Sequence, residues 1–386
     1  MPHGIAIAGF GIAGGALALL LARQGHRVTL FERAPRLGPV GAGFLLQPSG
    51  QAVLARLGLL AGLAGRSEPI AGLRARTHRG RRLIELGSAS LPGSQGALGV
   101  HRGVVFEALH EAVRAQGIEI VLDFPVTGWR QEGGRVVVCG EGDREAGPFD
   151  LLVAADGARS RLRRQVDPTV SERDDPYAAL WAVGAGTPIR GHLFQVTRGT
   201  REMCGLLPLG GGRTNFFWGL RARDWEALRA DGFPAFQARV LALAPEAEDI
   251  FDTVRSLDAC VFATYRHARP RKIHRGSVVL VGDAAHATTP HLGQGANLSL
   301  VDAASLADEL ARGGSLNEAL VRHARARYRQ TRFYCQLSSL LSPFFQSDVP
   351  LLGSLRDFGL PWFPALPGMR RAMERTLAGW KQGWWG

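Results

Sequence analysis

Residues 4–33 read GIAIAGFGIAGGALALLLARQGHRVTLFER and are the most informative part of the sequence about its architecture. It begins with a short apolar run, turns at a cluster of glycines, continues as an apolar helical stretch closed by Gly25, and ends in a second apolar run before Glu32. A strand, a helix and a second strand in this order form a βαβ unit, whose two strands are parallel. We therefore predict that the chain opens with a parallel sheet and helices packed on it.

Three glycines in this unit, Gly9, Gly11 and Gly14, have the spacing GxGxxG. In that context the first glycine permits a tight turn, the second lets the backbone approach a pyrophosphate, and the third lets the helix pack on the strand. The helix N-terminus offers unpaired N–H groups to phosphate, and Glu32 can accept hydrogen bonds from an adenosine ribose. The pattern predicts a dinucleotide site but leaves open whether the dinucleotide is FAD or NAD(P).

A second segment, DLLVAADGARSRLR at residues 150–163, is an apolar strand that runs into Asp156 and Gly157. Taken alone, it is more typical of a surface strand-to-helix turn in which Asp156 caps the helix.

A third segment, SVVLVGDAAHATTPHLGQGANLSLVDAASLADEL at residues 277–310, contains a buried strand that ends at Asp283. The carboxyl ends of strands are where open α/β sheets place ligand-binding groups. After a loop with Pro290, the run from Gly293 to Gly295 opens a long helix with apolar residues at helical spacing. The N-terminus of that helix is a second place for negative charge.

Together the three segments resemble those of the FAD-dependent single-component aromatic monooxygenases, the family of para-hydroxybenzoate hydroxylase, salicylate hydroxylase and the ubiquinone-biosynthesis hydroxylases. GFGIAG with Glu32, DGARSRLR and GDAAHATTPHLGQGANLSLVDA match the family motifs in order, and residues 41–58 resemble the segment after the family's second strand. The resemblance implies an α/β protein with a Rossmann-like FAD-binding domain, a mostly antiparallel β-sheet substrate domain and a helical C-terminus.

The resemblance also implies a role for each matching residue. The cofactor-binding residues are Gly9, Gly11 and Gly14 at the FAD pyrophosphate, Glu32 at the ribose, Arg33 at the adenosine side, Arg102 at the ribityl and phosphate region, Asp156 and Gly157 at FAD and NAD(P)H, Asp283 at the ribityl hydroxyls, Pro290 against the isoalloxazine, and Gly293 and Gly295 at its N1 and O2. A helix N-terminus at that edge would stabilise the negative charge of a reduced flavin.

By resemblance, NAD(P)H reduces the flavin, O2 adds to give a C4a-hydroperoxide, and one oxygen atom enters a planar aromatic or heteroaromatic substrate. The candidate catalytic residues are Pro290, as the residue at the ring, and His192 and Tyr265, as groups that could deprotonate a phenolic substrate. A flavoprotein oxidase or reductase and a quinone-precursor hydroxylase at a membrane surface remain as alternatives. A flavin halogenase is disfavoured, because the chain has no GWxWxIP segment and its two lysines, Lys272 and Lys381, come late.

Alternating runs in the middle of the chain predict strands at 177–185, 192–196, 202–207, 214–221 and 258–265, interrupted by a helix at 224–243. We assign residues 1–72, 98–175 and 268–340 to the FAD-binding domain, 73–97 and 176–267 to the substrate domain, and 341–386 to a C-terminal helical segment. The aromatic residues that could line the substrate pocket or simply pack in the core are Trp181, Phe194, Phe217, Trp218 and Phe262.

The composition narrows the remaining choices. The net charge of +12 comes from dispersed arginines without a basic helix or zinc finger, so we expect no nucleic-acid partner. No apolar run approaches the roughly 20 residues of a membrane span, and the start of the chain has no signal-peptide pattern. Four scattered cysteines without metal-ligand spacing predict no metal and a cytoplasmic protein. The expected partners are a small aromatic substrate and O2, with no stable membrane insertion, in a monomer or homodimer. The aromatic C-terminus could instead contact a membrane surface.

Overall fold

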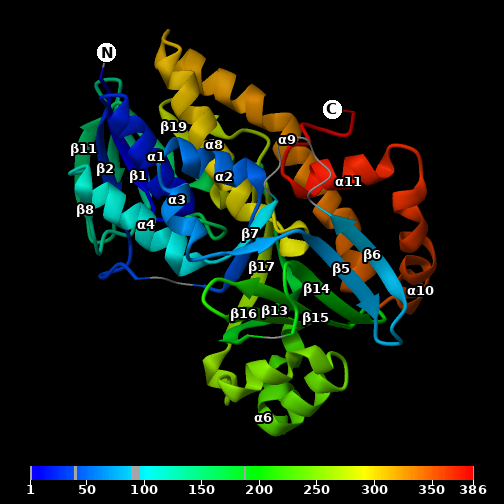
Figure 1. Ribbon diagram of the computed structural model, residues 1–386. Coiled ribbons are helices and arrows are strands. Elements are labelled where there is room, and N and C mark those ends of the chain that lie inside the picture. The colour runs from blue at the N-terminus through cyan, green and yellow to red at the C-terminus, as the bar shows by residue number, and fades with distance from the viewer. Residues whose placement is uncertain (1, 39–40, 88–95, 187, 386) are drawn as a thin grey trace.

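The structure is a computed structural model that describes residues 2–38, 41–87, 96–186 and 188–385. Two large sheets dominate it, one six-stranded and one seven-stranded, and two three-stranded sheets accompany them (Figure 1). The predicted α/β class with a second, mostly antiparallel sheet and a helical C-terminus is confirmed.

The six-stranded sheet contains the predicted βαβ unit, formed by β1 (Gly4–Ala8), α1 (Ile12–Arg23) and β2 (Arg27–Phe31). Its strand order is β18-β19-β12-β1-β2-β8, and every pairing is parallel except that of β18 with β19. The other strands are β8 (Glu119–Val121), β12 (Leu151–Ala154), β18 (His274–Arg275) and β19 (Val278–Leu280).

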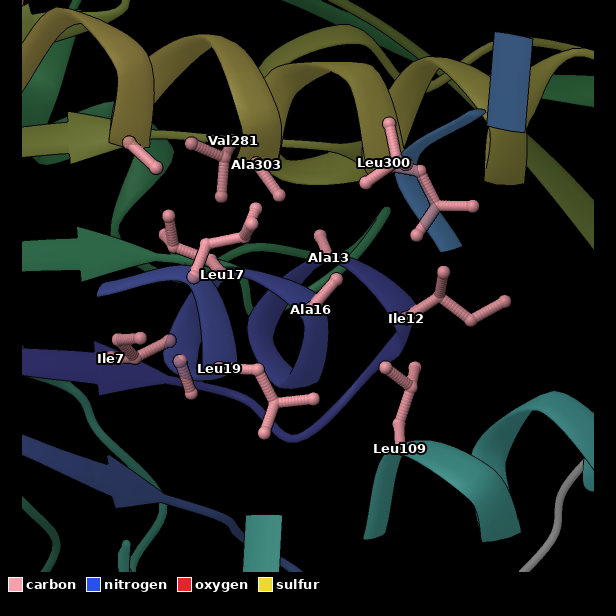
Figure 2. Packing of buried hydrophobic residues seen from close by; sticks show 14 of the residues in the cluster. Ile7, Ile12, Ala13, Ala16, Leu17, Leu19, Leu109, Val281, Leu300 and Ala303 are labelled. Carbon is pink, nitrogen blue, oxygen red and sulfur yellow. The ribbon is translucent and has the colours of Figure 1, made fainter. Parts of the chain in front are cut away.

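Apolar layers cover both faces of this sheet. Helices pack on one face, namely α1, α2 (Pro48–Arg56), α3 (Leu60–Ala64), α4 (Arg102–Ala115) and α8 (Gly295–Ala311). Figure 2 shows α1 between its neighbours, with Leu17 and Ala13 toward Ala303 and Leu300 of α8, and Leu109 of α4 on another side. A three-stranded sheet packs on the opposite face and consists of β9 (Gly128–Glu132), β10 (Arg135–Cys139) and β11 (Glu145–Phe149). The sheet is thus buried on both sides, as parallel sheets are.

The seven-stranded sheet has the order β17-β13-β16-β15-β14-β5-β6, with a single parallel pairing between β14 and β5. Its strands are β5 (Gly72–Thr77), β6 (Arg82–Gly87), β13 (Ser171–Ala185), β14 (His192–Arg198), β15 (Glu202–Leu209), β16 (Arg213–Arg221) and β17 (Val261–Arg269). The helix α6 (Trp225–Leu241) covers one face, at the bottom of Figure 1.

The predicted segments 73–97 and 176–267 both supply strands to this sheet, although residues 88–95 lie outside the described part of the chain. Two strands begin at other residues than the sequence predicts. The strand β13 begins at Ser171, inside the stretch assigned to the FAD-binding domain. The last strand begins at Val261 rather than Asp258, because Ser256 caps a short helix over Leu257–Ala259.

The small sheet β3-β7-β4 joins the two large ones and consists of β3 (Gly43–Leu46), β4 (Glu68–Ile70) and β7 (Ala97–His101). The remaining helices are α5 (Arg163–Val166), α7 (Asp283–His286), α9 (Leu316–Phe345), α10 (Pro350–Gly359) and α11 (Met369–Leu377). The long α9 continues past residue 341, and Pro343 lies in its last turn. Within the described ranges, no helix combines the length and apolar character that a membrane crossing requires.

Candidate active site

A cavity of about 560 Å³ is lined by residues of the seven-stranded sheet, of the small sheet, and of the loops and helix starts that follow strands of the six-stranded sheet. It gathers residues from all three sequence motifs. The predicted site residues that line it are Gly11, Arg102, Gly157, Tyr265, Asp283, Pro290, Gly293 and Gly295. The other predicted cofactor residues, Gly9, Gly14, Glu32, Arg33 and Asp156, lie outside this lining.

Two of the three glycines in the loop between β1 and α1 are tightly packed, and the third has open space beside it. A Cβ on Gly9, whose φ is +104°, would lie 2.5 Å from the carbonyl oxygen of Ala155, and a Cβ on Gly14 would lie 2.0 Å from that of Gly9. A Cβ on Gly11 would meet no atom within 4 Å. Gly9 and Gly14 therefore let the chain pack closely, while Gly11 leaves the helix N-terminus accessible from the cavity.

Glu32 lies directly beside this loop. Its Oε2 accepts a hydrogen bond from the Phe10 N–H at 2.7 Å, and its Oε1 accepts one from the Ala34 N–H at 3.0 Å. Both bonds fix the carboxylate at the end of β2, next to the N-terminus of α1.

The turn at Asp156 carries a buried polar atom without a partner. Oδ2 of Asp156 accepts from the Arg161 N–H at 2.9 Å, whereas its Oδ1 is buried and has no hydrogen-bond partner. Burial raises the pKa of Asp156. The next residue, Gly157, has a φ of +83° and open space where a Cβ would lie, so its backbone can approach a ligand closely.

Arg163 ties the second motif to the third. Its side chain is fully buried, and its Nη2 donates to the carbonyl oxygens of Gly157 at 3.2 Å and Asp283 at 2.9 Å. Glu172, 2.6 Å away, balances its charge. We assigned Arg163 no role from the sequence, where it is one of several arginines in DGARSRLR.

A second buried ionic group supports the third motif. Oδ2 of Asp302 accepts from the Gly282 N–H at 2.8 Å and lies 2.7 Å from Nε2 of His286, and its Oδ1 accepts from Nε of Arg327 at 2.6 Å. Burial opposes ionisation of Asp302, but His286 and Arg327 hold its pKa well below its usual range. Burial likewise lowers the pKa of His286, yet the nearby Asp302 carboxylate leaves it raised.

The loop from Pro290 to Gly295 leads into α8. Gly293 has a φ of +61° and nothing within 4 Å of the Cβ position, so backbone is exposed to the cavity here. Gln294 anchors the loop from behind, because its Nε2 donates to the carbonyl oxygen of Leu377 at 2.7 Å.

These features fit a dinucleotide with a planar ring system. Two helices of more than three turns, α1 and α8, point their N-termini at one cavity, each next to a glycine without a side chain to block approach. The carboxylates of Glu32 and Asp283 can accept from ribose-type hydroxyls, and the exposed guanidinium of Arg102 suits phosphate.

Residues 3–336 match the family model described as FAD binding domain. The chain belongs to this FAD-binding family. Its relatives over most of its length are monooxygenases and hydroxylases, and the chain is a FAD-dependent monooxygenase. It is 30% identical to aurachin C monooxygenase/isomerase of Stigmatella aurantiaca, over 84% of each chain. It is 32% identical to 3-amino-4-hydroxybenzoate 2-monooxygenase of Streptomyces cremeus, covering 85% of this chain and 84% of that one, and 32% identical to salicylate hydroxylase of Pseudomonas putida, covering 98% and 96%.

Solved structures share the fold of this monooxygenase. The crystal structure of HpxO from Klebsiella pneumoniae, complexed with FAD and uric acid, superposes with a TM-score of 0.83 at 22% identity, covering 99% of this chain and 98% of that one. The tetrameric form of 2-methyl-3-hydroxypyridine-5-carboxylic acid oxygenase superposes with a TM-score of 0.80 at 22% identity, covering 96% of each chain.

Only two of the three candidate catalytic residues line the cavity. Pro290 and Tyr265 line the cavity, but His192 does not, since it begins β14 and its Nδ1 lies 3.0 Å from the carbonyl oxygen of Arg190. His192 is therefore not placed to contact a ligand in this cavity. Burial raises the pKa of Tyr265, so its hydroxyl stays protonated at neutral pH and can donate a hydrogen bond. His267, also in this region, is buried against Asp175 at 2.7 Å.

Two of the five candidate pocket aromatics line the cavity of the monooxygenase. Trp181 and Phe217 face it as a tilted pair, with ring centroids 5.2 Å apart. Phe194 and Trp218 face the opposite side of the sheet, in the core under α6, and Phe262 stacks on Trp225 at 5.0 Å.

Several polar residues on the cavity wall were not predicted from the sequence, and three of them carry side-chain amides near the seven-stranded sheet. Gln195, Asn215 and Gln346 all line the cavity, and Oδ1 of Asn215 accepts from the Gly43 N–H at 2.8 Å. For Gln195 and Asn215 the available signal was an uncharged polar residue inside an otherwise apolar strand, as in LFQV and TNFFW, whereas Gln346 follows the long helix α9.

Proposed function

We propose that this monooxygenase hydroxylates a planar aromatic or heteroaromatic substrate, held between the loop at Pro290 and the Trp181–Phe217 pair. One observation carries the proposal: a single cavity is lined both by the loop that leads into α8 and by that aromatic pair. Aromatic rings favour offset or tilted contact with a planar ligand. The named substrates of the relatives, among them salicylate, agree with a ring of this kind.

We propose that the chain holds FAD with the residues of its three motifs. The pyrophosphate would lie at Gly9, Gly11 and Gly14, where the N-terminus of α1 is accessible. The remaining contacts would come from Glu32 at the adenosine ribose, Arg33 at the adenosine side, Arg102 at the ribityl and phosphate region, Asp283 at the ribityl hydroxyls, Asp156 and Gly157 at FAD and NAD(P)H, and Pro290, Gly293 and Gly295 at the isoalloxazine. The unpartnered Oδ1 of Asp156 and the open positions at Gly11 and Gly157 support this assignment.

FAD, when bound, supplies the redox chemistry by accepting a hydride from NAD(P)H and reacting with O2. The protein's part is electrostatic and steric. The N–H groups at the start of α8 would stabilise negative charge on the ring edge beside Gly293 and Gly295. Tyr265, kept protonated, would donate a hydrogen bond to a substrate oxygen, and the apolar wall would exclude water from the reacting atoms.

The division into two domains and a C-terminal segment is part of the same proposal. The FAD-binding domain would comprise the six-stranded sheet and its two covering layers, and the substrate domain the seven-stranded sheet with α6. We further propose that the protein works in the cytoplasm as a monomer or homodimer, with a small aromatic substrate and O2 as its reaction partners. Its four free cysteines support the cytoplasmic location, because cysteines stay reduced in that compartment.

The decisive experiment is anaerobic reduction of the bound flavin by NADH or NADPH, with and without a panel of hydroxybenzoates, hydroxypyridines, quinolones and phenazines, followed by product analysis in air. The proposal expects one class of ligand to accelerate reduction and to be recovered with one added oxygen atom. Fast reduction without any oxygenated product would favour a reductase, and no reduction by either nucleotide would favour an oxidase.

A second candidate is a hydroxylase of lipophilic quinone precursors at a membrane surface. The observation that favours it is an exposed apolar face on α10 and the following turn η5 (Leu360–Ala365), where Leu351, Phe358 and Trp362 are 65%, 69% and 64% exposed. Flotation of the FAD-loaded protein with anionic phospholipid vesicles tests this candidate. Loss of flotation in Phe358→Ser with Trp362→Ser would support it, and absence of wild-type flotation would eliminate it.

A further inference from the structure

The cavity wall formed by the seven-stranded sheet has an aromatic end and a neutral polar end in one row. Trp181 on β13 lies opposite Phe217 on β16, Phe217 lies opposite Gly205 on β15, and Gly205 lies opposite Gln195 on β14. Trp181, Phe217 and Gln195 all line the cavity. Four adjacent strands therefore present the row Trp, Phe, Gly, Gln to a ligand.

Gly205 connects the two ends of this row. A Cβ built on Gly205 would lie 1.9 Å from Cε1 of Phe217, so the Phe217 ring lies over the glycine backbone and points toward β14. Neighbouring strands are about 4.8 Å apart, which puts the β16 and β14 backbones about 10 Å from each other. The ring of Phe217 spans part of that distance. A planar ligand stacked on Phe217 therefore has one edge within reach of the Gln195 side chain.

The face of Gln195 follows from strand alternation. Leu193 and Gln195 line the cavity, whereas Phe194 and Val196 between and beyond them belong to the core under α6. The backbone of Gln195 is paired on both sides, with Gly205 and Ala75. Its side-chain amide thus faces the ligand and offers both a donor and an acceptor.

The cations near this wall lie away from Gln195 in the part of the chain that the structure describes. Arg159 donates to Thr264 at 2.9 Å, and Thr264 belongs to β17, four strands away from β14 in the sheet. Arg266 lines the cavity, but its Nε and Nη2 donate to the Asp174 carboxylate at 2.8 and 3.1 Å. Arg102 belongs to the cofactor side, next to Gly41 at the start of α4. The internal stretches outside the description, 39–40, 88–95 and 187, contain no charged residue or histidine in the sequence.

Two further titratable groups that line the cavity, His291 and Tyr265, are neutral. Burial lowers the pKa of His291 to about 4, so this histidine, which lines the cavity beside Pro290, is uncharged at neutral pH. Tyr265 stays protonated. A carboxylate placed here would lose its hydration without a cation to replace it, which is costly.

Resting on the proposed function, we infer that Gln195 determines specificity and that the substrate is an uncharged planar heteroaromatic with a hydrogen-bonding edge, such as a ring N–H beside a carbonyl or hydroxyl, rather than a ring carboxylate. The amide of Gln195 pairs with that edge while the ring stacks on Phe217. A site built for hydrogen bonding discriminates against ligands that leave its buried polar groups unpaired.

The test measures ligand binding to the oxidised FAD-loaded protein by flavin absorbance, with no turnover. The probes are two matched pairs, phenol with salicylate and hydroxyquinoline with hydroxyquinoline carboxylate. The wild type should bind each neutral probe at least about tenfold more tightly than its carboxylate. Gln195→Leu should weaken binding of the neutral probes by about tenfold, and Gln195→Arg should reverse the preference within each pair.

Thr197→Val is the matched control, because Thr197 lies two residues along β14, is buried, and is not among the cavity residues. Its ligand constants should equal those of the wild type, and flavin content should be unchanged in all variants. The inference would be overturned if the wild type bound the carboxylates more tightly than the neutral probes, or if Gln195→Leu had the binding constants of the wild type. If those carboxylates were hydroxylated, the proposed function would still stand. Preferential binding of neutral probes that are never oxygenated would support the inference while the proposed function fails.

Discussion

Removing the Asp302 carboxylate is expected to destabilise the FAD-loaded protein by about 3–5 kcal/mol, the usual cost of stranding one member of a buried ion pair. Asp302 is 2% exposed and accepts from three buried donors, those of Arg327, His286 and the Gly282 N–H, at 2.6, 2.7 and 2.8 Å. In Asp302→Ala the guanidinium of Arg327, 5% exposed, keeps its charge and loses its carboxylate. The Gly282 N–H loses its acceptor as well.

The matched control lies on the same helix. Asp308 of α8 is 2.6 Å from Arg56, the same separation as in the buried pair, but these side chains are 49% and 42% exposed. Water screens such a pair, so Asp308→Ala should cost less than about 1 kcal/mol. Both variants would be unfolded in urea at one fixed FAD concentration, because bound cofactor adds to the apparent stability. Equal losses in the two variants would refute the argument that burial makes Asp302 the important partner.

Three further predictions concern the cofactor side. Gly11→Ala should leave the urea unfolding midpoint of the apoprotein unchanged but lower its FAD affinity at least about tenfold. Gly14→Ala should lower the unfolding midpoint itself, because the Cβ at position 14 would clash with the Gly9 carbonyl and the Cβ at position 11 would not. Equal decreases of the unfolding midpoint in the two variants would contradict this. Asp283→Ala should reduce the flavin retained on purification without unfolding the chain, and unchanged flavin content would refute its assignment. The stabilisation from His286, whose pKa is raised in the fold, should be complete below its ordinary value of 6.5 and disappear as the pH rises through the folded value. The difference in urea midpoint between wild type and His286→Gln should therefore shrink with rising pH, and a constant difference would contradict the assignment.

The cofactor side of the protein could be predicted from the sequence because its signals are local. The βαβ unit is formed by 28 consecutive residues from Gly4 to Phe31, and the constraint that selects Gly14, contact with the Gly9 carbonyl, acts within one turn. The buried arginine interactions that support the site could not be predicted from the sequence, because their partners are far apart along the chain. Arg327 reaches Asp302 from α9, and Arg163 reaches Asp283 across 120 positions, so neither pairing leaves a pattern in neighbouring residues.

The substrate side shows a second limit. Phe216, Phe217 and Trp218 are consecutive aromatic residues in β16, and alternation says only that Phe217 faces away from the other two. Which face is the cavity depends on where α6 packs, and it packs on Phe216 and Trp218. With both faces of the strand apolar, the sequence could not decide between pocket and core.

The cofactor side and the substrate wall differ in which chemical groups form them, and this difference affects substrate specificity. The cofactor side uses backbone groups, helix N-termini and absent side chains, so its chemistry is fixed by the path of the chain. The substrate wall uses side chains from four paired strands, and Gln195 can be exchanged there without changing any backbone hydrogen bond. A substitution at Gln195 should therefore alter which ring binds while leaving the flavin in place, whereas one at Gly205 would force the Phe217 ring to move and change the wall itself. We therefore expect substrate choice in this protein to be separable from the fold at Gln195 and coupled to it at Gly205.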